Sequence, residues 1–250
     1  MRRVLLYPAG SGLPCAHAAK ILYTHNIPLI DHPSPDITHL LLDTPSFADD
    51  GKLPGGNDAK LLLSMLPPSV TVIGGNLDCS LLAGYATLDL LRSEEYLCRN
   101  AAITVHCAIK TALPHLSRTL SDCCCVVIGW GRIGKCLASL LRKMGCDVTL
   151  LIRNPKDLAL ANTLGYRVCS CRKQDQLPAR IHLIFNTAPE RVLSDDVQRQ
   201  FTDCVKIDLA SRPGLCGKDV IYARGLPGKL APESSGNLIA ECILSYLKEE

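Results

Sequence analysis

The sequence predicts an α/β protein with two doubly wound parallel sheets, joined by a long connector helix and closed by a C-terminal helix. Short apolar runs alternate with helical patterns in both halves of the chain, which is typical of parallel sheets. A glycine-rich turn at residues 129–134 follows one apolar run and precedes an amphipathic stretch. That order predicts a strand, a tight turn and the start of a helix.

The N-terminal half supplies the elements of the first sheet. We expect strands at residues 4–7, 28–31, 39–42 and 70–73, and helices at residues 16–24 and 58–65. Residues 33–36 and 44–56 are rich in Pro, Gly and Asp and are predicted to be loops. The turn Ala9-Gly10-Ser11-Gly12 lacks the spacing of a nucleotide-binding loop, so we interpret it as a strand-to-helix turn beside a cleft.

The C-terminal half follows a long helical pattern at residues 93–117, which Pro114 should bend or end. Further strands are expected from residue 123 onward and at residues 148–152, 167–169, 182–185 and 205–209. Residues 234–247 have apolar positions at helical spacing and predict the closing helix.

Composition narrows the functional class. A chain of 250 residues with 47% hydrophobic and 20% charged residues is an ordinary globular protein with room for two modest domains. The net charge of +3 comes from scattered basic residues, which argues against a nucleic-acid partner. No apolar segment approaches a membrane span, so we expect a cytoplasmic protein without a membrane partner. The 14 cysteines include no CxxC pair, and we interpret them as small buried apolar residues rather than disulfides or metal ligands.

The glycine turn carries the strongest functional signal. It consists of Gly129, Trp130, Gly131, Arg132, Ile133 and Gly134. In a GxGxxG turn the first glycine permits the tight turn, the second lets a pyrophosphate approach the backbone, and the third lets helix pack against strand. The helix N-terminus offers free N–H groups and a partial positive charge to the phosphates. We therefore predict a dinucleotide site here.

The residues after the next strand indicate which dinucleotide is preferred. NAD-binding units usually place a carboxylate there to receive the ribose 2′-hydroxyl. This chain has Arg153 and Asn154 instead, followed by Lys156. Arg153 can pair bidentately with a 2′-phosphate and Lys156 can assist, which favours NADP(H) over NAD(H). The alternative is that Arg153 is a solvated loop cation.

Four separate segments now resemble one family. They are residues 127–134, 185–189, 207–214 and 225–236, and their order and spacing resemble the A subunit of bacterial dipicolinate synthase over roughly residues 95–250. The resemblance implies a two-domain, formate-dehydrogenase-like arrangement and a nicotinamide-linked oxidation. Its substrate would be a dihydrodipicolinate-type intermediate of the lysine pathway, and its product the endospore calcium chelator dipicolinate. It also implies the flavoprotein-like B subunit of dipicolinate synthase as partner.

The predicted domains follow from these motifs. Residues 1–92 would form an N-terminal substrate domain of flavodoxin or Rossmann type, and residues 93–118 the connector helix. Residues 119–232 would form the NAD(P)-binding Rossmann domain, and residues 233–250 the C-terminal helix. A small dicarboxylate is the expected substrate, and a homodimer is left open.

The resemblance also suggests site residues. Around the cofactor we expect the post-strand residues Asn186, Thr187, Ala188 and Pro189, and then Asp208, Ala210 and Ser211. Arg212 is the predicted partner of a substrate carboxylate, with a structural loop cation as the alternative. His106 on the connector is the candidate weak base, with Thr104 and Asn100 on the same stretch. A helix-surface or buried core histidine is the alternative for His106.

The chain also departs from the family pattern. Residues 7–12 stand where the family has a Gly-Gly-Asp-type turn, and His106 stands where its connector has a glutamate. A non-catalytic NADP(H)-binding sensor or inactive partner protein is therefore an open alternative. A D-2-hydroxyacid dehydrogenase is disfavoured, because that chemistry needs a histidine late in the chain and none follows His182.

Overall fold

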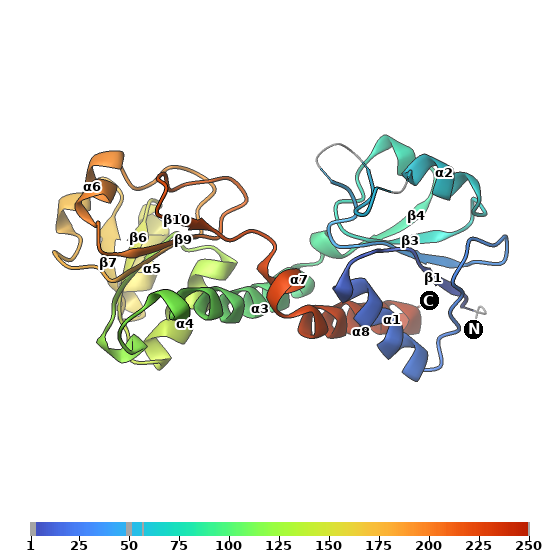
Figure 1. Cartoon of the computed structure of the whole chain (residues 1–250), viewed down its shortest axis with the longest axis horizontal. Helices are drawn as coiled ribbons and strands as arrows, with labels where there is room; N and C mark the ends of the chain where they lie inside the picture. Colours follow the sequence, from blue (N-terminus) through green and yellow to red (C-terminus); the bar gives the residue numbers. More distant parts are fainter. Residues whose placement is uncertain (1–3, 49–51, 57, 250) are drawn as a thin grey trace. The chain divides into compact units, whose positions relative to one another are not determined.

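The computed structural model describes residues 4–48, 52–56 and 58–249, which form two parallel sheets flanked by helices (Figure 1). This confirms the predicted fold class. The chain divides into two compact units, of which unit 1 comprises Met1–Asn100 with Pro227–Glu250 and unit 2 comprises Ala101–Leu226. The four predicted domain segments, with limits at residues 92, 118 and 232, stay predictions. No helix among the described residues has both the length and the apolar character to span a membrane.

The sheet of unit 1 has the order β1-β2-β3-β4 and is parallel throughout. Its strands are β1 (Leu6–Pro8), β2 (His39–Leu41), β3 (Thr71–Gly74) and β4 (Ala86–Asp89). The predicted strand at 28–31 is wrong, because only an isolated bridge forms there, between Leu29 and Leu6. Pro28 has no N–H to donate, and its carbonyl accepts from Leu6. The chain still passes outside β1 before returning to β2, which is the doubly wound path.

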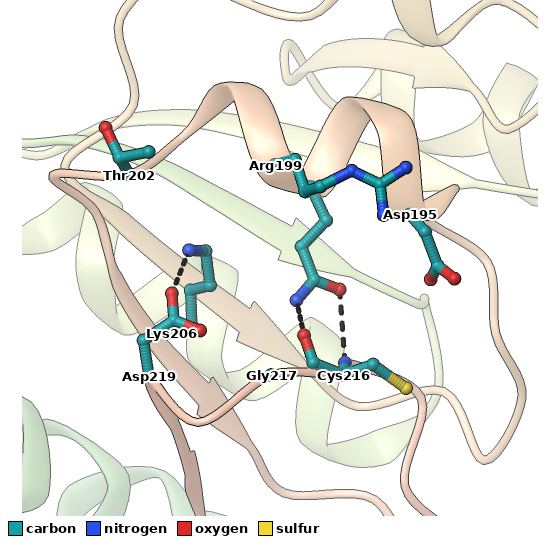
Figure 2. Close-up of a pocket in the computed structure, with 8 residues that line it drawn as sticks. Asp195, Arg199, Thr202, Lys206, Cys216, Gly217 and Asp219 are labelled. Carbon is teal, nitrogen blue, oxygen red and sulfur yellow. Dashed lines mark hydrogen bonds and ion pairs between the residues drawn. The ribbon is translucent and has the colours of Figure 1, made fainter.

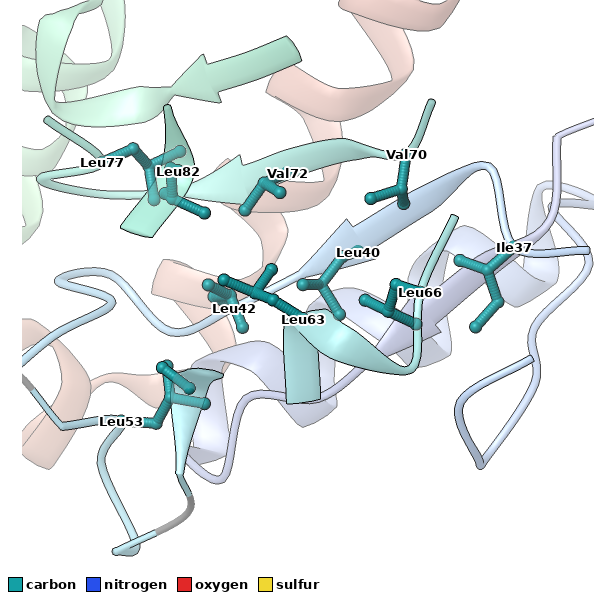
Figure 3. Packing of buried hydrophobic residues seen from close by; sticks show 11 residues of the cluster. Ile37, Leu40, Leu42, Leu53, Leu63, Leu66, Val70, Val72, Leu77 and Leu82 are labelled. Carbon is teal, nitrogen blue, oxygen red and sulfur yellow. The ribbon is translucent and has the colours of Figure 1, made fainter. Parts of the chain in front are cut away.

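Helices cover this sheet. α2 (Ala59–Ser64), capped by Asp58, packs its Leu63 on a cluster of buried apolar side chains (Figure 3). Leu40 and Leu42 reach that cluster because alternate residues of a strand face the same side. α1 (Leu13–Thr24) packs instead against α8 (Pro232–Glu249), where the predicted closing helix is confirmed. Of the predicted loop 44–56, residues 49–51 lie outside the described part of the chain.

The predicted connector is α3 (Glu94–Ala112), which passes into a short 3₁₀ turn at Leu113–His115. The helix therefore ends five residues before the predicted limit of 117, at the turn that contains Pro114. The end of α3 at this position agrees with the steric clash that disfavours the α-helical conformation for the residue before a proline.

The sheet of unit 2 has six parallel strands in the order β10-β9-β8-β5-β6-β7. They are β5 (Cys124–Ile128), β6 (Asp147–Ile152), β7 (Arg167–Ser170), β8 (Leu183–Asn186), β9 (Val205–Asp208) and β10 (Val220–Tyr222). The helices are α4 (Arg132–Lys143), α5 (Pro155–Thr163), α6 (Asp195–Gln200) and α7 (Leu226–Leu230), the last of which runs past the limit of the unit. Strand order reverses between β5 and β8, which is where dinucleotides bind in this topology.

Candidate nucleotide-binding site

The predicted glycine turn joins β5 to α4 at the switch point. Gly129 has a φ of +99°, a left-handed conformation that glycine adopts without strain. Gly134 lies so close to the turn that a Cβ there would be 2.4 Å from the Gly129 carbonyl oxygen. A Cβ on Gly131 would meet nothing within 4 Å. Each glycine therefore has the geometry that its expected role requires.

The turn also fits a pyrophosphate group chemically. Gly131 is the N-cap of α4 and has no side chain to cap the first N–H groups of the helix. The open space at Gly131 lets an anion reach them. The buried Trp130 Nε1 has no hydrogen-bond partner among the described residues. Since donors are provided and the space is free, the residues fit a dinucleotide.

The loop after β8 is tied to the glycine turn by hydrogen bonds. Thr187 Oγ1 donates to the carbonyl oxygen of Ile128 at 2.8 Å. Asn186 is buried, and its Nδ2 donates to Ala188 O at 2.9 Å and to Asp208 Oδ1 at 3.0 Å. Both amide hydrogens of Asn186 are therefore used internally. The geometry gives Asn186 and Thr187 a positioning role at the edge of the site.

Asp208 organises the next loop in the same way. Its side chain is buried with 1% exposure, and Oδ1 accepts from Ala210 N at 3.0 Å. Oδ2 accepts from Gly214 N at 2.7 Å and from Leu215 N at 2.9 Å. Together with the bond from Asn186, these contacts occupy both carboxylate oxygens. Asp208 therefore holds the 209–215 loop in place from inside the protein.

A cavity of about 240 Å³ opens beside the turn. Among the predicted cofactor residues it is lined by Gly129, Trp130, Gly131, Arg153, Asn154, Ala188 and Pro189. The predicted residues Arg132, Ile133, Gly134, Lys156, Asn186, Thr187, Asp208, Ala210 and Ser211 are not part of its wall. The structure adds Leu151, Ile152, Asp157, Cys171, Glu190 and Val192, which the motifs did not single out.

Trp130 forms a buried aromatic contact in the wall of this cavity. Its ring is 5.4 Å from that of Tyr166 in an edge-to-face arrangement. The ammonium group of Lys135 lies 5.9 Å from the Trp130 ring centroid. The indole is therefore held in a fixed place directly beside the glycine turn.

The charges in the wall are mixed. Arg153, at the end of β6, forms an ion pair with Glu190, which follows Pro189. Asp157, in the first turn of α5, adds a second carboxylate. Asn154 is the N-cap of α5 and accepts from the backbone N–H of Lys156 at 3.0 Å. The sequence analysis missed Glu190 because it belongs to no motif. Its place in the site follows from the fold, since the ends of β6 and β8 lie at the same edge of the sheet.

The predicted catalytic residues are not all brought together. Arg212 lies exposed on the loop that Asp208 holds, and it makes no ion pair with any residue that the structure describes. On α3, Thr104 is buried whereas His106 is exposed. Two positions along a helix turn by about 200°, so these side chains leave opposite faces of α3. Asn100 lies one turn before Thr104, on the same face.

The turn after β1 does not have the features of a second anion site. The Asp43 carboxylate accepts from the backbone N–H groups of Ser11 and Gly12, both at 2.9 Å. It thus occupies the N-terminus of α1 with a negative charge supplied by the chain itself. This supports the interpretation of residues 9–12 as a strand-to-helix turn.

A second cavity, of about 440 Å³, lies between α6 and the β9–β10 edge (Figure 2). Gln198 bonds both the N–H and the carbonyl of Cys216, so its amide is satisfied. Lys206 is only 3% exposed and pairs with Asp219. These bonds join α6 and β9 to the loop at residues 216–219.

Asp219 should make stability depend on pH. The Lys206 ammonium donates to Asp219 and lowers the pKa of that carboxyl. The pair therefore stabilises fully above the ordinary aspartate range and loses its effect as pH falls through the lowered pKa. We expect Asp219→Asn to lower the free energy of unfolding at neutral pH by about 1–3 kcal/mol. This is less than for a fully buried ion pair, because water screens the half-exposed Asp219. Urea denaturation measures this change.

The control is Asp196→Asn, which breaks an exposed ion pair with Arg199 and should cost less than about 1 kcal/mol. At acid pH the wild type and Asp219→Asn should converge, because both then lack the carboxylate. Equal stability of the two proteins at neutral pH would contradict this role for Asp219.

Half of the cysteines are buried as predicted: seven of the fourteen are buried, six are partly buried, and Cys98 is exposed. All fourteen are free thiols. Burial raises the pKa of Cys15 and of Cys204 to about 12, so both stay protonated at neutral pH. No group of His, Cys, Asp and Glu among the described residues is arranged to hold a metal ion.

The chain is similar to several known proteins. Residues 125–192 match the family model of ketopantoate reductase PanE/ApbA. Over 171 residues the chain is 29% identical to the A subunit of dipicolinate synthase of Bacillus subtilis (strain 168), covering 64% of this chain and 57% of that protein. The matched region thus spans little more than half the length of this relative.

Solved structures share the fold. The chain matches dipicolinate synthase A chain from Bacillus subtilis with a TM-score of 0.83 and 19% identity, covering 100% of this chain and 97% of the other. It matches an NAD-complexed D-isomer specific 2-hydroxyacid dehydrogenase from Lactobacillus delbrueckii ssp. bulgaricus with a TM-score of 0.52 and 10% identity, covering 98% and 96%. The chain is therefore similar in sequence to a dipicolinate synthase A subunit, and its two-unit, NAD(P)-binding type of fold is like that of dipicolinate synthase A chain and of D-2-hydroxyacid dehydrogenases.

Proposed function

We propose that this chain is an NADP(H)-dependent oxidoreductase that oxidises a dihydrodipicolinate-type intermediate to dipicolinate. The observation that carries the proposal is the glycine turn, open at Gly131 and placed at the strand-order reversal. The identity to a protein named as the A subunit of dipicolinate synthase supports the reaction. In this proposal residues 119–232 bind the cofactor and residues 1–92 contribute the substrate side.

The cofactor residues have distinct roles. The uncapped N-terminus of α4 binds the pyrophosphate, and Gly131 leaves room for it. Arg153 lines the cavity at the end of β6 with its side chain 70% exposed, and it pairs with the 2′-phosphate. This contact favours NADP(H) over NAD(H). When bound, the oxidised nicotinamide accepts the hydride that leaves the substrate.

The substrate residues bind a carboxylate and take up a proton. Arg212 is exposed and without an ion pair among the described residues, so its planar fork is available for a substrate carboxylate. Loss of one hydride and one proton from the dihydropyridine leaves an aromatic ring, which drives the step and lets a weak base suffice. His106, exposed on α3, is the proposed base. Asn100 and Thr104 are proposed as positioning residues on the other side of that helix.

The proposal includes a partner and a location. The relative is named as one of the subunits of its synthase, and we propose that this chain likewise works with a flavoprotein-like B subunit. The fourteen free thiols and a nicotinamide cofactor suit a reducing compartment, so we place the reaction in the cytoplasm.

Arg212→Ala tests the proposed reaction. With a dihydrodipicolinate-type substrate generated in situ, we expect kcat/KM to fall about a hundredfold, because a bidentate charged contact to the substrate is lost. The Kd for NADPH should not change, since Arg212 is not part of the cavity wall. The assay follows nicotinamide absorbance, with and without the B subunit.

The matched control is Arg180→Ala, which removes an exposed arginine just before β8, at the opposite edge of the sheet. It should leave both constants unchanged. Nucleotide binding without turnover of any dihydrodipicolinate-type substrate would favour the second candidate, a non-catalytic NADP(H)-binding protein. The separation of Thr104 from His106 on α3 is the observation that keeps that candidate open.

A further inference from the structure

The cavity beside the glycine turn contains an ion pair that the GxGxxG motif does not explain. Arg153 comes from the end of β6, and Glu190 comes from the loop after β8. Their side chains bond directly across the cavity wall that both residues line. Both remain more than half exposed, at 70% and 53%, so a ligand in the cavity can reach either of them.

The two side chains favour opposite forms of the adenosine ribose. A 2′-phosphate carries nearly two negative charges, so it attracts Arg153 and is repelled by Glu190. To bind, it must also replace the Glu190 carboxylate as the partner of Arg153. A ribose 2′-hydroxyl instead donates a hydrogen bond, which a carboxylate accepts. The same carboxylate therefore opposes one cofactor and favours the other.

We propose that Glu190 is a cofactor-specificity residue, which lowers the preference of this pocket for NADP(H) by holding Arg153 and by supplying an acceptor for the 2′-hydroxyl of NAD(H). It takes the role of the carboxylate that is missing after β6, but from the neighbouring loop. The inference rests on the proposed function only in that a nicotinamide dinucleotide binds in this cavity. It concerns binding and is independent of the substrate that is oxidised.

Isothermal titration of NADPH and of NADH measures the effect. We expect Glu190→Gln to raise the preference for NADPH, expressed as the ratio of the two dissociation constants, on the order of tenfold. Most of the change should be tighter NADPH binding, with weaker NADH binding adding to it. The gain should shrink at high salt, because both charges are exposed to solvent.

Two further variants separate the pair from the general charge of the pocket. Asp157→Asn removes the same charge from the same wall, but its carboxylate does not pair with Arg153. In Asp157→Asn the ratio of the dissociation constants for NADPH and NADH should stay within about twofold of the wild-type ratio. In an Arg153→Gln background, Glu190→Gln should raise the preference for NADPH clearly less than it does in the wild type, since the cation it releases is absent and only the direct effects of the carboxylate on the two cofactors remain.

Three results would overturn the inference: an unchanged ratio in Glu190→Gln, an equal shift in Asp157→Asn, or a full shift that persists without Arg153. Failure of the proposed function gives a different result. If the wild type binds neither NADPH nor NADH, the nucleotide site itself is wrong. If it binds both and Glu190→Gln leaves their ratio unchanged, only the role of Glu190 is wrong.

Discussion

Asp208→Asn is expected to destabilise the protein by about 3–5 kcal/mol. The wild-type carboxylate is 1% exposed and accepts four hydrogen bonds, from Asn186, Ala210, Gly214 and Leu215. An asparagine replaces one oxygen by an NH₂ group, which faces N–H donors instead of accepting from them. Each buried donor left without an acceptor costs about 1–3 kcal/mol, and the charge of the acceptor is lost as well. Denaturant unfolding measures the change.

The matched control for this substitution is Asp203→Asn, an exposed aspartate just before β9. It should change stability by less than about 0.5 kcal/mol. Because Asp208 holds the loop that presents Arg212, any Asp208→Asn protein that folds should also lose turnover. A stability within about 1 kcal/mol of the wild type would contradict the scaffold role of Asp208.

Gly134→Ala is expected to damage both stability and nucleotide binding. The new Cβ would lie 2.4 Å from the oxygen and 3.0 Å from the carbon of the Gly129 carbonyl, and this neighbour is backbone. A Gly→Ala change in a helix gains at most about 1 kcal/mol, whereas overpacking costs about 1–3 kcal/mol or more. The clash should win, move α4 away from the turn, and weaken NADPH binding about a hundredfold.

Gly131→Ala separates packing from ligand approach. Its Cβ would enter open space, so stability should stay within about 0.5 kcal/mol of the wild type. NADPH should nevertheless bind about tenfold more weakly, because the methyl group occupies the approach of the pyrophosphate. Calorimetry with thermal denaturation tests the two variants together. Equal behaviour of Gly134→Ala and Gly131→Ala would contradict the separate roles of these glycines.

The sequence predicted the architecture because apolar periodicity is strong where strands are buried on both faces. β5 and β8 are of this kind, and both were predicted. β4 and β10 were missed. β4 has an exposed start and no apolar run, and β10 is an edge strand with only one buried residue. Residues 28–31 have an apolar pattern but only form a bridge, since Pro28 cannot donate to a neighbouring strand.

The site was predictable where one local segment carries the chemistry. The glycine turn is such a segment, and each of its glycines has the expected geometry. Glu190 could not be assigned, because its importance arises from Arg153, which lies 37 residues away in sequence. Asn186 and Asp208 were expected to bind the cofactor, yet their polar atoms bond to each other and to the backbone. Local sequence indicates that a polar residue is needed, but tertiary structure decides what it contacts.

Titration of NADPH followed by the fluorescence of Trp130 tests the nucleotide site most directly. Trp130 is the only tryptophan in the chain and lines the cavity beside the glycine turn, so no other indole contributes to the signal. A nucleotide site at this turn predicts a saturable change in tryptophan emission with NADPH, a smaller affinity for NADH, and a weaker NADPH response in Gly131→Ala. No change with either nucleotide, together with no heat of binding by calorimetry, would contradict it.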